Sequence, residues 1–310
     1  MKILRGLVNL KAPNRGCVVT VGNYDGVHRG HQFVIDTSAR HGKQLGLPVA
    51  IVLFEPQPLE YFLLDQAPPR LTRLREKLIQ LAKLPVDFVV LLRFDKNFAD
   101  LEPEAFVQKV LIDGLRTQYL AVGDDFRFGK NRKGDISLLK SVGQKRGFVV
   151  ESIESYCLDN ERVSSTVIRH ALESGSLDRV RSFLGRRYSV WGRVEEGAKR
   201  GRIIGFPTAN IRMRRENTPI KGVFAVTMTG IGHREIFGIA NIGTRPTVDG
   251  HKLLLEVHLY DFQADIYGRL VEIHFWQKIR DEKRFDSIEE LKKQIKKDTL
   301  VGRKLLQELD

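Results

Sequence analysis

The sequence predicts two successive domains, an α/β domain built on a parallel sheet and an all-β antiparallel barrel with a C-terminal helix. Three observations predict this arrangement. From Cys17 to Gly185 apolar runs alternate with amphipathic segments, which is typical of a parallel sheet covered on both faces. After Gly185 short β-type segments are separated by turns containing Gly, Pro or Asn, which is typical of an antiparallel barrel. A chain of 310 residues is long enough for two such cores.

Continuous runs of Val, Ile and Leu predict the strands of the first domain, at residues 18–21, 49–54, 88–94, 119–122 and 148–151. Helical patterns fill the gaps between them, including residues 31–45, 71–84 and 103–115. The last of these helices begins with Pro103 between two glutamates, a normal first turn. Ligands of such sheets bind at the carboxyl ends of the strands, where we expect the segment 22–31 to lie.

The second half is predicted to be a barrel with strands at residues 188–194, 222–228, 236–242, 253–260 and 270–276, followed by a closing helix over 287–297. The change of pattern falls at residues 183–187. We therefore expect residues 1–184 to form the first domain and residues 185–310 the second.

The composition is that of a globular protein, with 42% hydrophobic and 29% charged residues. The formal net charge of +13 admits nucleic acid, an anionic membrane or phosphate-rich small molecules as partners, and charge alone chooses none of them. Basic residues are interleaved with acidic ones along most of the chain. The basic run at 292–297 is expected to be a solvated helix face.

Cysteine usage and the N-terminus favour a cytoplasmic protein. Cys17 and Cys157 are too few for a disulfide framework, and both are expected to be buried, reduced thiols on strands. The N-terminus has charges close together and lacks the long apolar region of a signal peptide. No stretch approaches the roughly 20 apolar residues of a membrane helix.

The segment 22–31, Gly-Asn-Tyr-Asp-Gly-Val-His-Arg-Gly-His, predicts a nucleotide site. It connects an apolar strand to a helical pattern, and phosphates bind at the first amides of a helix, where its dipole is positive. The glycines let a nucleotide approach the backbone, and His28 and His31 lie on one helical face. Both imidazoles can donate to charge that develops on an α-phosphate as pyrophosphate leaves. The alternative is a pair of surface or capping histidines in a turn.

Further motifs follow segment 22–31 in order along the chain. Those of the first half are Phe54-Glu55-Pro56-Gln57-Pro58, Val122-Gly123-Asp124-Asp125-Phe126-Arg127-Phe128-Gly129 and Val163-Ser164-Ser165-Thr166-Val167-Ile168-Arg169. Those of the second half are Gly205-Phe206-Pro207-Thr208-Ala209-Asn210, Asn241-Ile242-Gly243-Thr244-Arg245-Pro246-Thr247 and Glu256-Val257-His258-Leu259-Tyr260-Asp261-Phe262. In combination they resemble the signatures of bacterial bifunctional riboflavin kinase/FAD synthetases over nearly the whole chain.

This resemblance implies a Rossmann-like nucleotidylyltransferase fold for the first domain and a riboflavin kinase barrel for the second. It implies that the first domain joins FMN to the AMP moiety of ATP. An FMN phosphate is already an adequate anion, since a phosphate monoester loses its second proton near pH ~6, so that no general base is needed there.

By the same resemblance, His28 and His31 are the catalytic residues that bind ATP phosphates in the first domain. The other ATP-binding residues implied are Gly22, Asn23, Ser164, Ser165 and Arg169. The serine run before a helical pattern is also a helix start, and on its own N-capping is the better explanation for it.

The flavin contacts of the first domain rest mainly on the resemblance. They are Asn23, Asp25, Phe54, Pro56, Pro58, Phe126 and Phe128. Asn and Asp are favoured turn residues, so the first two have a structural alternative. The proline-containing segment can present a rigid apolar edge to the flavin, whereas paired phenylalanines around an arginine are often ordinary packing.

The second half lacks the Gly-x-x-x-x-Gly-Lys-Ser/Thr of a P-loop, so its ATP cradle must differ. The resemblance implies that Gly201 and Gly205 bind ATP and that Thr208 and Asn210 bind Mg²⁺. Their side-chain oxygens suit a hard cation that takes few protein ligands and several phosphate or water oxygens. A Pro-Thr-x-Asn turn by itself is more often structural.

Glu256 is the candidate general base for phosphorylation of riboflavin, because the ribityl alcohol must lose a proton as it attacks the γ-phosphoryl group. Strand alternation puts Glu256 and His258 on the face opposite the apolar residues of segment 255–259. The alternative is a solvent-facing pair on an amphipathic strand. Residues implied to contact the flavin by resemblance to the family's flavin-side loop are Arg280, Glu282 and Phe285.

The expected enzyme converts riboflavin and ATP to FMN and ADP, and then FMN and ATP to FAD and pyrophosphate, with Mg²⁺ as cofactor and neither nucleic acid nor membrane as a partner. One alternative is a nucleic-acid-binding protein with a basic barrel, which requires basic and aromatic residues on one strand face. The candidate strands do not concentrate Lys and Arg in that way. Another alternative is a flavin- or nucleotide-sensing protein that binds without catalysis. No particular oligomeric state is predicted.

Overall fold

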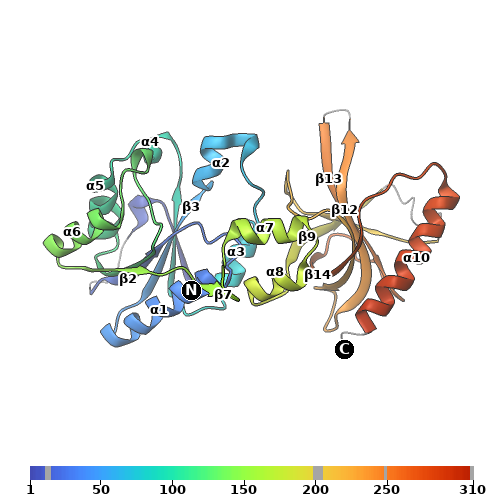
Figure 1. Ribbon diagram of the computed structural model, residues 1–310, viewed down its shortest axis with the longest axis horizontal. Helices are drawn as coiled ribbons and strands as arrows, with labels where there is room; N and C mark the ends of the chain where they lie inside the picture. The colour runs from blue at the N-terminus through green and yellow to red at the C-terminus, as the bar shows by residue number, and fades with distance from the viewer. Residues whose placement is uncertain (11–14, 198–204, 248–249, 308–310) are drawn as a thin grey trace. The chain divides into compact units, whose positions relative to one another are not determined.

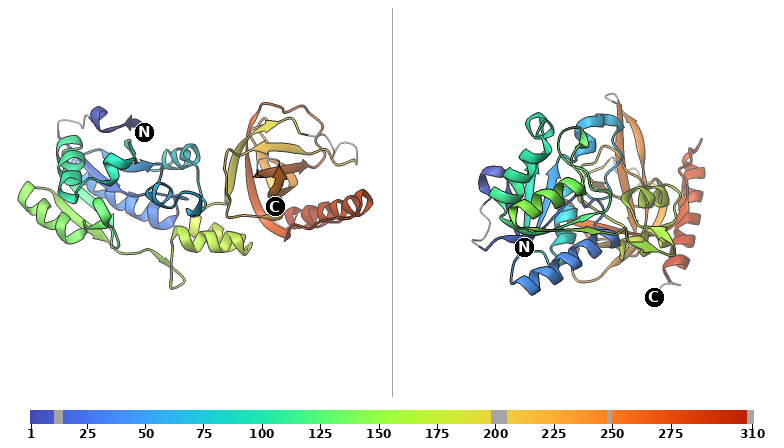
Figure 2. Two further views of the ribbon diagram at one scale, coloured as in Figure 1. Left: turned by 90° about the horizontal axis from the view of Figure 1, so that it is seen from above. Right: turned by 60° about the vertical axis from the view of Figure 1, so that its left-hand side comes forward.

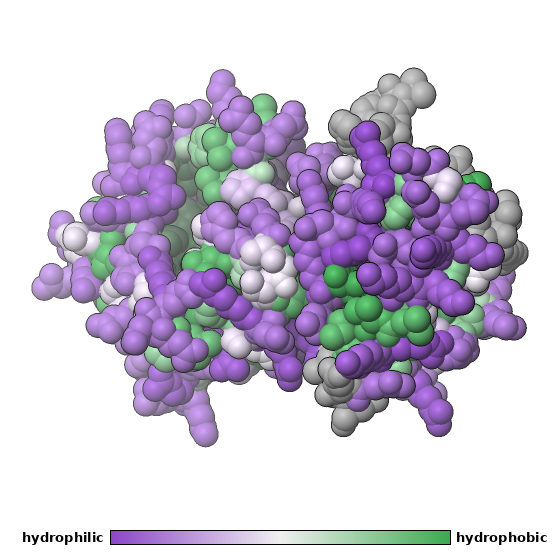
Figure 3. All heavy atoms as spheres, turned by 45° about the vertical axis from the view of Figure 1, so that its right-hand side comes forward, coloured by the Kyte–Doolittle hydropathy of each residue, from purple (hydrophilic) through white to green (hydrophobic). Residues whose placement is uncertain are grey.

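The computed structural model describes residues 1–10, 15–197, 205–247 and 250–307 (Figure 1). The chain forms two compact units, one of Met1–Pro68 with Thr72–Ser164 and the other of Pro69–Leu71 with Ser165–Asp310. Within the described ranges, every helix is too short or too polar to span a bilayer. Hydrophilic residues cover most of the face shown in Figure 3, with smaller hydrophobic areas between them, as the interleaved charges predict.

The first unit contains a six-stranded parallel sheet in the order β1-β4-β3-β2-β5-β6. Its strands are β1 (Lys2–Arg5), β2 (Cys17–Val21), β3 (Val49–Glu55), β4 (Phe88–Arg93), β5 (Thr117–Gly123) and β6 (Val149–Ile153). The predicted parallel sheet is therefore confirmed. The sequence does not reveal β1, because it is a four-residue, mostly exposed strand at the edge of the sheet.

Helices cover both faces of this sheet (Figures 1 and 2). The helices that cover it are α1 (Arg29–Leu45), α3 (Leu74–Leu81), α4 (Lys96–Ala99), α5 (Pro103–Phe106), the π-helix η3 (Val107–Gly114) and α6 (Ile136–Arg146). The helix α2 (Pro58–Leu63) follows β3 and buries none of its residues, and short 3₁₀ turns lie at Leu7–Asn9, Leu64–Gln66 and Lys130–Arg132. The helix expected over 71–84 is shorter, because Thr72 is hydrogen-bonded to the loop after β2 instead.

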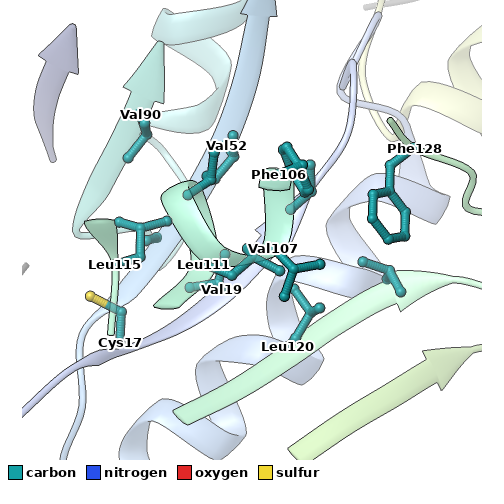
Figure 4. Packing of buried hydrophobic residues seen from close by; sticks show 14 of the residues in the cluster. Cys17, Val19, Val52, Val90, Phe106, Val107, Leu111, Leu115, Leu120 and Phe128 are labelled. Carbon is teal, nitrogen blue, oxygen red and sulfur yellow. The ribbon is translucent and has the colours of Figure 1, made fainter. Parts of the chain in front are cut away.

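Alternating side chains of the central strands enter two separate cores. Val52 packs with Val107 and Leu111 of η3 on one face (Figure 4), whereas Ile51 packs with Ile35 of α1 on the other. This arrangement explains why the central strands β2 to β5 are continuous apolar runs in the sequence, since both faces of these strands are largely buried.

The two cysteines differ in environment. Cys17 is buried in the core of Figure 4, where burial raises the pKa of its thiol to about 11. The expectation of burial is wrong for Cys157, which is exposed. It lies on β7 (Cys157–Leu158), which pairs with β8 (Glu161–Arg162) in a separate two-stranded ribbon, so the main sheet does not cover it. Both thiols are free.

The second unit contains a closed antiparallel barrel in the order β10-β13-β12-β11-β14-β9, which confirms the second predicted architecture. Its strands are β9 (Ser189–Glu195), β10 (Ala209–Arg212), β11 (Gly222–Thr229), β12 (Ile236–Thr247), β13 (Gly250–Leu259) and β14 (Leu270–Arg280). The strand β10 is absent from the prediction, since its four residues carry too short a pattern. Two helices precede the barrel, α7 (Ser165–Glu173) and α8 (Leu177–Leu184), and α8 packs against β14.

The closing helix α10 (Ile288–Gln307) lies along the outside of the barrel (Figure 2). It continues ten residues beyond the predicted end at Lys297, because Leu305 and Leu306 join a cluster with Ile239 and Tyr260 of the barrel. The four lysines of the run 292–297 are exposed, so the expected solvated face is confirmed.

Candidate active sites

The loop after β2 has a constrained backbone. Tyr24 and Val27 have positive φ angles of 49° and 44°, a conformation that costs a non-glycine residue about 1–3 kcal/mol. The hydroxyl of Tyr24 lies 2.6 Å from Oγ1 of Thr20, and the Asp25 carboxylate, 2% exposed, accepts hydrogen bonds from the Thr72 amide and hydroxyl at 3.0 and 3.2 Å. The surroundings therefore hold the loop in one conformation, and the turn function expected as an alternative for Asp25 is present.

The loop delivers His28 to the N-terminus of α1. Nδ1 of His28 accepts a hydrogen bond from the amide of His31 at 3.3 Å, and the two rings stack with their centroids 3.6 Å apart. Because Nδ1 is the acceptor, a neutral His28 carries its proton on Nε2, which is then the donor toward a ligand. His28 can therefore cap α1 through Nδ1 and still bind a phosphate through Nε2.

Gly30 allows this close packing at the start of α1. A Cβ on Gly30 would stand 3.2 Å from the His28 ring and 3.3 Å from the carbonyl oxygen of Val163. The structure therefore brings Val163, the first residue of its motif, next to the N-terminus of α1, although the two are far apart in sequence.

The remaining predicted ATP residues of the first half are divided between the two units. Ser164 is the last residue of the first unit, whereas Ser165 and Arg169 belong to α7 of the second. Within the second unit, Nε of Arg169 donates to the carbonyl of Pro69 at 2.7 Å. A shared polyphosphate contact with the histidines remains a prediction.

The three phenylalanines among the predicted flavin residues of the first unit share one core. Phe54 and Phe126 are both half-buried against the same core, and the ring of Phe54 lies 5.4 Å from that of Phe98. Phe128 is buried beneath Phe126, with the two rings stacked at 5.6 Å, so it packs in the way expected of an ordinary core residue.

Pro56 and Pro58 are half-buried and follow the end of β3. Pro58 is the first residue of α2 and Gln57 caps that helix, with its amide donating to the Glu60 carboxylate at 2.9 Å. The segment therefore presents a fixed apolar edge beside Phe54.

The barrel places Glu256 beside two asparagines. Glu256 on β13 pairs with Asn210 of β10 on one side and with Asn241 of β12 on the other. Residues paired directly across strands project from the same face of a sheet. Leu255 and Val257 are buried, whereas Glu256 is half-buried, so the predicted alternation along β13 is confirmed.

The segment before β10 is held next to this row. Nδ1 of His258 lies 2.9 Å from the carbonyl oxygen of Pro207, and its ring meets the ring of Phe206 edge-on at 5.4 Å. Thr208 follows directly and is exposed. Gly205 adopts a positive φ of 85°, which suits glycine, and Gly201 lies outside the described residues.

The oxygen atoms of Thr208, Asn210 and Glu256 fit a cation that takes its other ligands from a phosphate chain. Thr208 and Asn210 carry neutral oxygens, and the Glu256 carboxylate projects beside Asn210. Within residues 1–10, 15–197, 205–247 and 250–307, no three His, Cys, Asp or Glu side chains gather as a metal site. A Mg²⁺ ion that takes most of its ligands from ATP and water is consistent with these residues.

Two of the three predicted flavin residues at the end of β14 and just after it, Arg280 and Glu282, are held by contacts with other elements. Arg280 makes a bidentate ion pair with Asp298 of α10, with Nε at 3.0 and Nη2 at 2.8 Å from Oδ2. The Arg280 guanidinium also lies 5.7 Å from the centre of the Phe285 ring. Asp298 is 2% exposed, so this pair fixes the end of β14 against α10.

Glu282 reaches back over β12. Its carboxylate hydrogen-bonds to Asn241, and a Cβ at Gly243 would overlap it. Desolvation in this position raises the pKa of Glu282. Asn241 belongs to a motif of the second half, but the sequence alone assigns it no role. Only the strand register reveals that Asn241 links Glu256 to Glu282.

Comparisons with known proteins agree with both architectures. A family model described as FAD synthetase matches residues 10–167, and one described as riboflavin kinase matches residues 184–306. The bifunctional riboflavin kinase/FMN adenylyltransferase of Escherichia coli (strain K12) is 50% identical over 304 residues, 98% of this chain and 97% of the relative. The Haemophilus influenzae protein of the same description is 47% identical over 299 residues, 96% of this chain and 97% of the relative.

A solved structure from Streptococcus pneumoniae, described as a macrolide-efflux protein, has the same fold. Its TM-score is 0.83 at 28% sequence identity, covering 97% of this chain and 98% of that chain.

The first unit combines a parallel sheet with paired histidines at a helix N-terminus, and the second is a barrel with a carboxylate between two asparagines. Together these features are typical of a two-domain transferase that uses nucleotides. The chain belongs to the bifunctional riboflavin kinase/FMN adenylyltransferase family. It phosphorylates riboflavin and adenylylates FMN, with the FAD synthetase domain N-terminal and the kinase domain C-terminal.

Proposed function

We propose that adenylylation of FMN takes place at the N-terminus of α1, with His28 and His31 as the catalytic residues. The observation that supports this most strongly is the stacked pair of imidazoles at 3.6 Å, with Nδ1 of His28 already used as an acceptor. An FMN phosphate oxygen attacks the α-phosphorus of ATP and pyrophosphate leaves. The two imidazoles donate to the negative charge that develops during this step.

The other residues of this site hold the two substrates in place. Gly22, Asn23, Ser164, Ser165 and Arg169 bind ATP in this proposal. Asn23 and Asp25 orient the flavin substrate in this proposal. The flavin ring lies against the apolar edge formed by Phe54, Pro56, Pro58 and Phe126, with Phe128 supporting Phe126 from the core.

In the barrel, Glu256 is the proposed general base. Its carboxylate takes the proton of the ribityl hydroxyl as that oxygen attacks the γ-phosphorus of ATP. Thr208 and Asn210 hold Mg²⁺, which when bound neutralises charge on the phosphates. Gly201 and Gly205 cradle the nucleotide. The pairing of Asn210 with Glu256 supports this assignment, because it sets the cation ligand and the base on one face of the barrel.

The riboflavin ring is proposed to contact Arg280, Glu282 and Phe285. The contacts of Arg280 with Asp298 and of Glu282 with Asn241, which pairs with Glu256, support this assignment.

We place the boundary between the catalytic domains at residues 184/185, a position supported by the match of the kinase model from residue 184 onward. Two free cysteines and a biosynthetic activity favour the cytoplasm. Riboflavin, FMN and ATP are the partners in this account, and nucleic acid is not one of them.

Two variants and one assay test the proposal. Riboflavin or FMN is supplied with MgATP, and FMN and FAD are separated by chromatography. His31→Ala is expected to stop at FMN, whereas Glu256→Gln is expected to make FAD only when FMN is supplied. Loss of both activities together in either folded variant would contradict two separate sites.

A further inference from the structure

Lys77 of α3 is a buried cation to which the mechanism above gives no role. It is 1% exposed, and its ammonium group donates to the backbone carbonyl of Asn23 at 2.6 Å. A buried charge is costly unless it is hydrogen-bonded or paired. The side chain therefore reaches from α3 to the loop between β2 and α1, the loop that ends at His28.

A second contact ties the same loop to the residues just before α3. Thr72 accepts a hydrogen bond from the amide of Gly26 at 2.9 Å through its Oγ1, and it donates to the Asp25 carboxylate through both its amide and its hydroxyl. Thr72 is also buried. Three positions of the loop, Asn23, Asp25 and Gly26, are thus held by Thr72 and Lys77.

The helix that provides these contacts is itself fixed. The amide of Arg73 donates to the Glu76 carboxylate at 2.7 Å, which closes the first turn of α3. Leu81 of this helix packs in one core cluster with Tyr24 and Val27, the two loop residues with positive φ. The polar contacts and the apolar packing therefore act on the same loop from the same helix.

We propose that Lys77 is a positioning residue for FMN adenylylation. Its ammonium holds the Asn23 carbonyl, and so keeps the loop in the conformation that sets His28 at the N-cap of α1 and stacks it on His31. Lys77 does this without contacting substrate. The inference rests on the proposed role of His28 and His31 in that reaction.

The test compares Lys77→Met with Lys83→Met in the full chain. Lys83 is exposed and lies just beyond the same helix, so its variant is the matched control. We expect Lys77→Met to lower kcat for FAD formation from FMN roughly 10- to 100-fold, because small displacements of catalytic groups have effects of that size. The riboflavin kinase activity of the same chain should change less than about threefold, since the barrel does not depend on this loop.

Hydrogen exchange supplies a readout that a merely structural role would not move. In Lys77→Met the amides of residues 22–28 should exchange faster, while protection of β2 to β5 is retained. Thr72→Val, which removes the hydroxyl contacts, should show the same pattern. Unchanged kcat in folded Lys77→Met would overturn the inference. Loss of protection throughout the sheet in both Lys77→Met and Thr72→Val would also overturn it, because Lys77 and Thr72 would then serve folding alone.

His31→Ala measured in parallel distinguishes a failure of the positioning role of Lys77 from a failure of the proposed site. If His31→Ala abolishes FAD formation and Lys77→Met does not, only the positioning role fails. If His31→Ala leaves FAD formation intact, the proposed site itself fails.

Discussion

Asn210 and Glu256 are direct register partners on the neighbouring strands β10 and β13 of the barrel. Their side chains project from one face because paired residues of antiparallel strands do so. A proposed cation ligand thus lies beside the proposed base. In the proposed mechanism this pairing directs the phosphate bound by the cation and the hydroxyl deprotonated by the base to the same place.

Glu256→Gln keeps the shape of this side chain and removes its basicity. We expect riboflavin phosphorylation to fall roughly 10² to 10⁴-fold, the usual contribution of a general base. FMN supplied directly should still become FAD, and riboflavin should still bind, as measured by quenching of flavin fluorescence. Phosphorylation near the wild-type rate would mean that Glu256 is only a strand-surface residue.

Asn210→Ala removes one of the two proposed Mg²⁺ ligands. The Mg²⁺ concentration that gives half-maximal kinase activity should rise roughly tenfold or more, since the protein supplies few oxygen ligands in such a site. Arg212→Met, at the exposed end of the same strand, serves as the control. An unchanged Mg²⁺ dependence in Asn210→Ala would remove Asn210 from the metal site.

His31→Ala removes one donor to the transition-state charge. FAD formation from FMN should slow by roughly 10²-fold or more, while FMN formation from riboflavin is retained. Steady-state rates for both reactions on one preparation provide the comparison. A folded variant that loses the two activities equally would show that the sites are not separate.

The ion pair between Arg280 and Asp298 predicts a difference in stability. Arg280→Met leaves the buried Asp298 carboxylate without its guanidinium partner and should lower the free energy of unfolding by about 3 kcal/mol. Arg212→Met breaks a solvent-exposed pair with Glu195 and should cost less than about 1 kcal/mol.

Tryptophan fluorescence during urea unfolding measures this difference in the full chain. The two tryptophans, Trp191 and Trp276, both lie on barrel strands, so the signal reports on the second unit. Equal effects of the two substitutions would mean that the pair with Asp298 contributes no more than a surface pair.

Local patterns predict much of this fold. Continuous apolar runs identify β2 to β6, and the change to short segments identifies the barrel, because each pattern extends over several residues of one element. The four-residue strands β1 and β10 are too short to carry such a pattern. The end of α10 is missed because Leu305 and Leu306 belong to it through contact with the barrel rather than through the helix sequence before them.

In the sites too, contacts between residues close in sequence are predictable, whereas contacts between distant residues are not. The spacing of His28 and His31 within one helical turn predicts that they meet, and they do. Thr72 lies 47 residues from Asp25 in sequence, and Lys77 lies 54 residues from Asn23, so no local pattern connects either pair. The position of Asn241 opposite Glu256 depends on strand register, which a single strand does not show.

Complementation between two variants tests directly whether one chain carries two separate sites that act in sequence. Neither His31→Ala nor Glu256→Gln alone should convert riboflavin to FAD at more than a small fraction of the wild-type rate. Mixed together with riboflavin and MgATP, they should form FAD, because FMN released by the first variant is adenylylated by the second. A mixture that accumulates FMN without FAD, although each variant retains its remaining activity when assayed alone, would contradict the account.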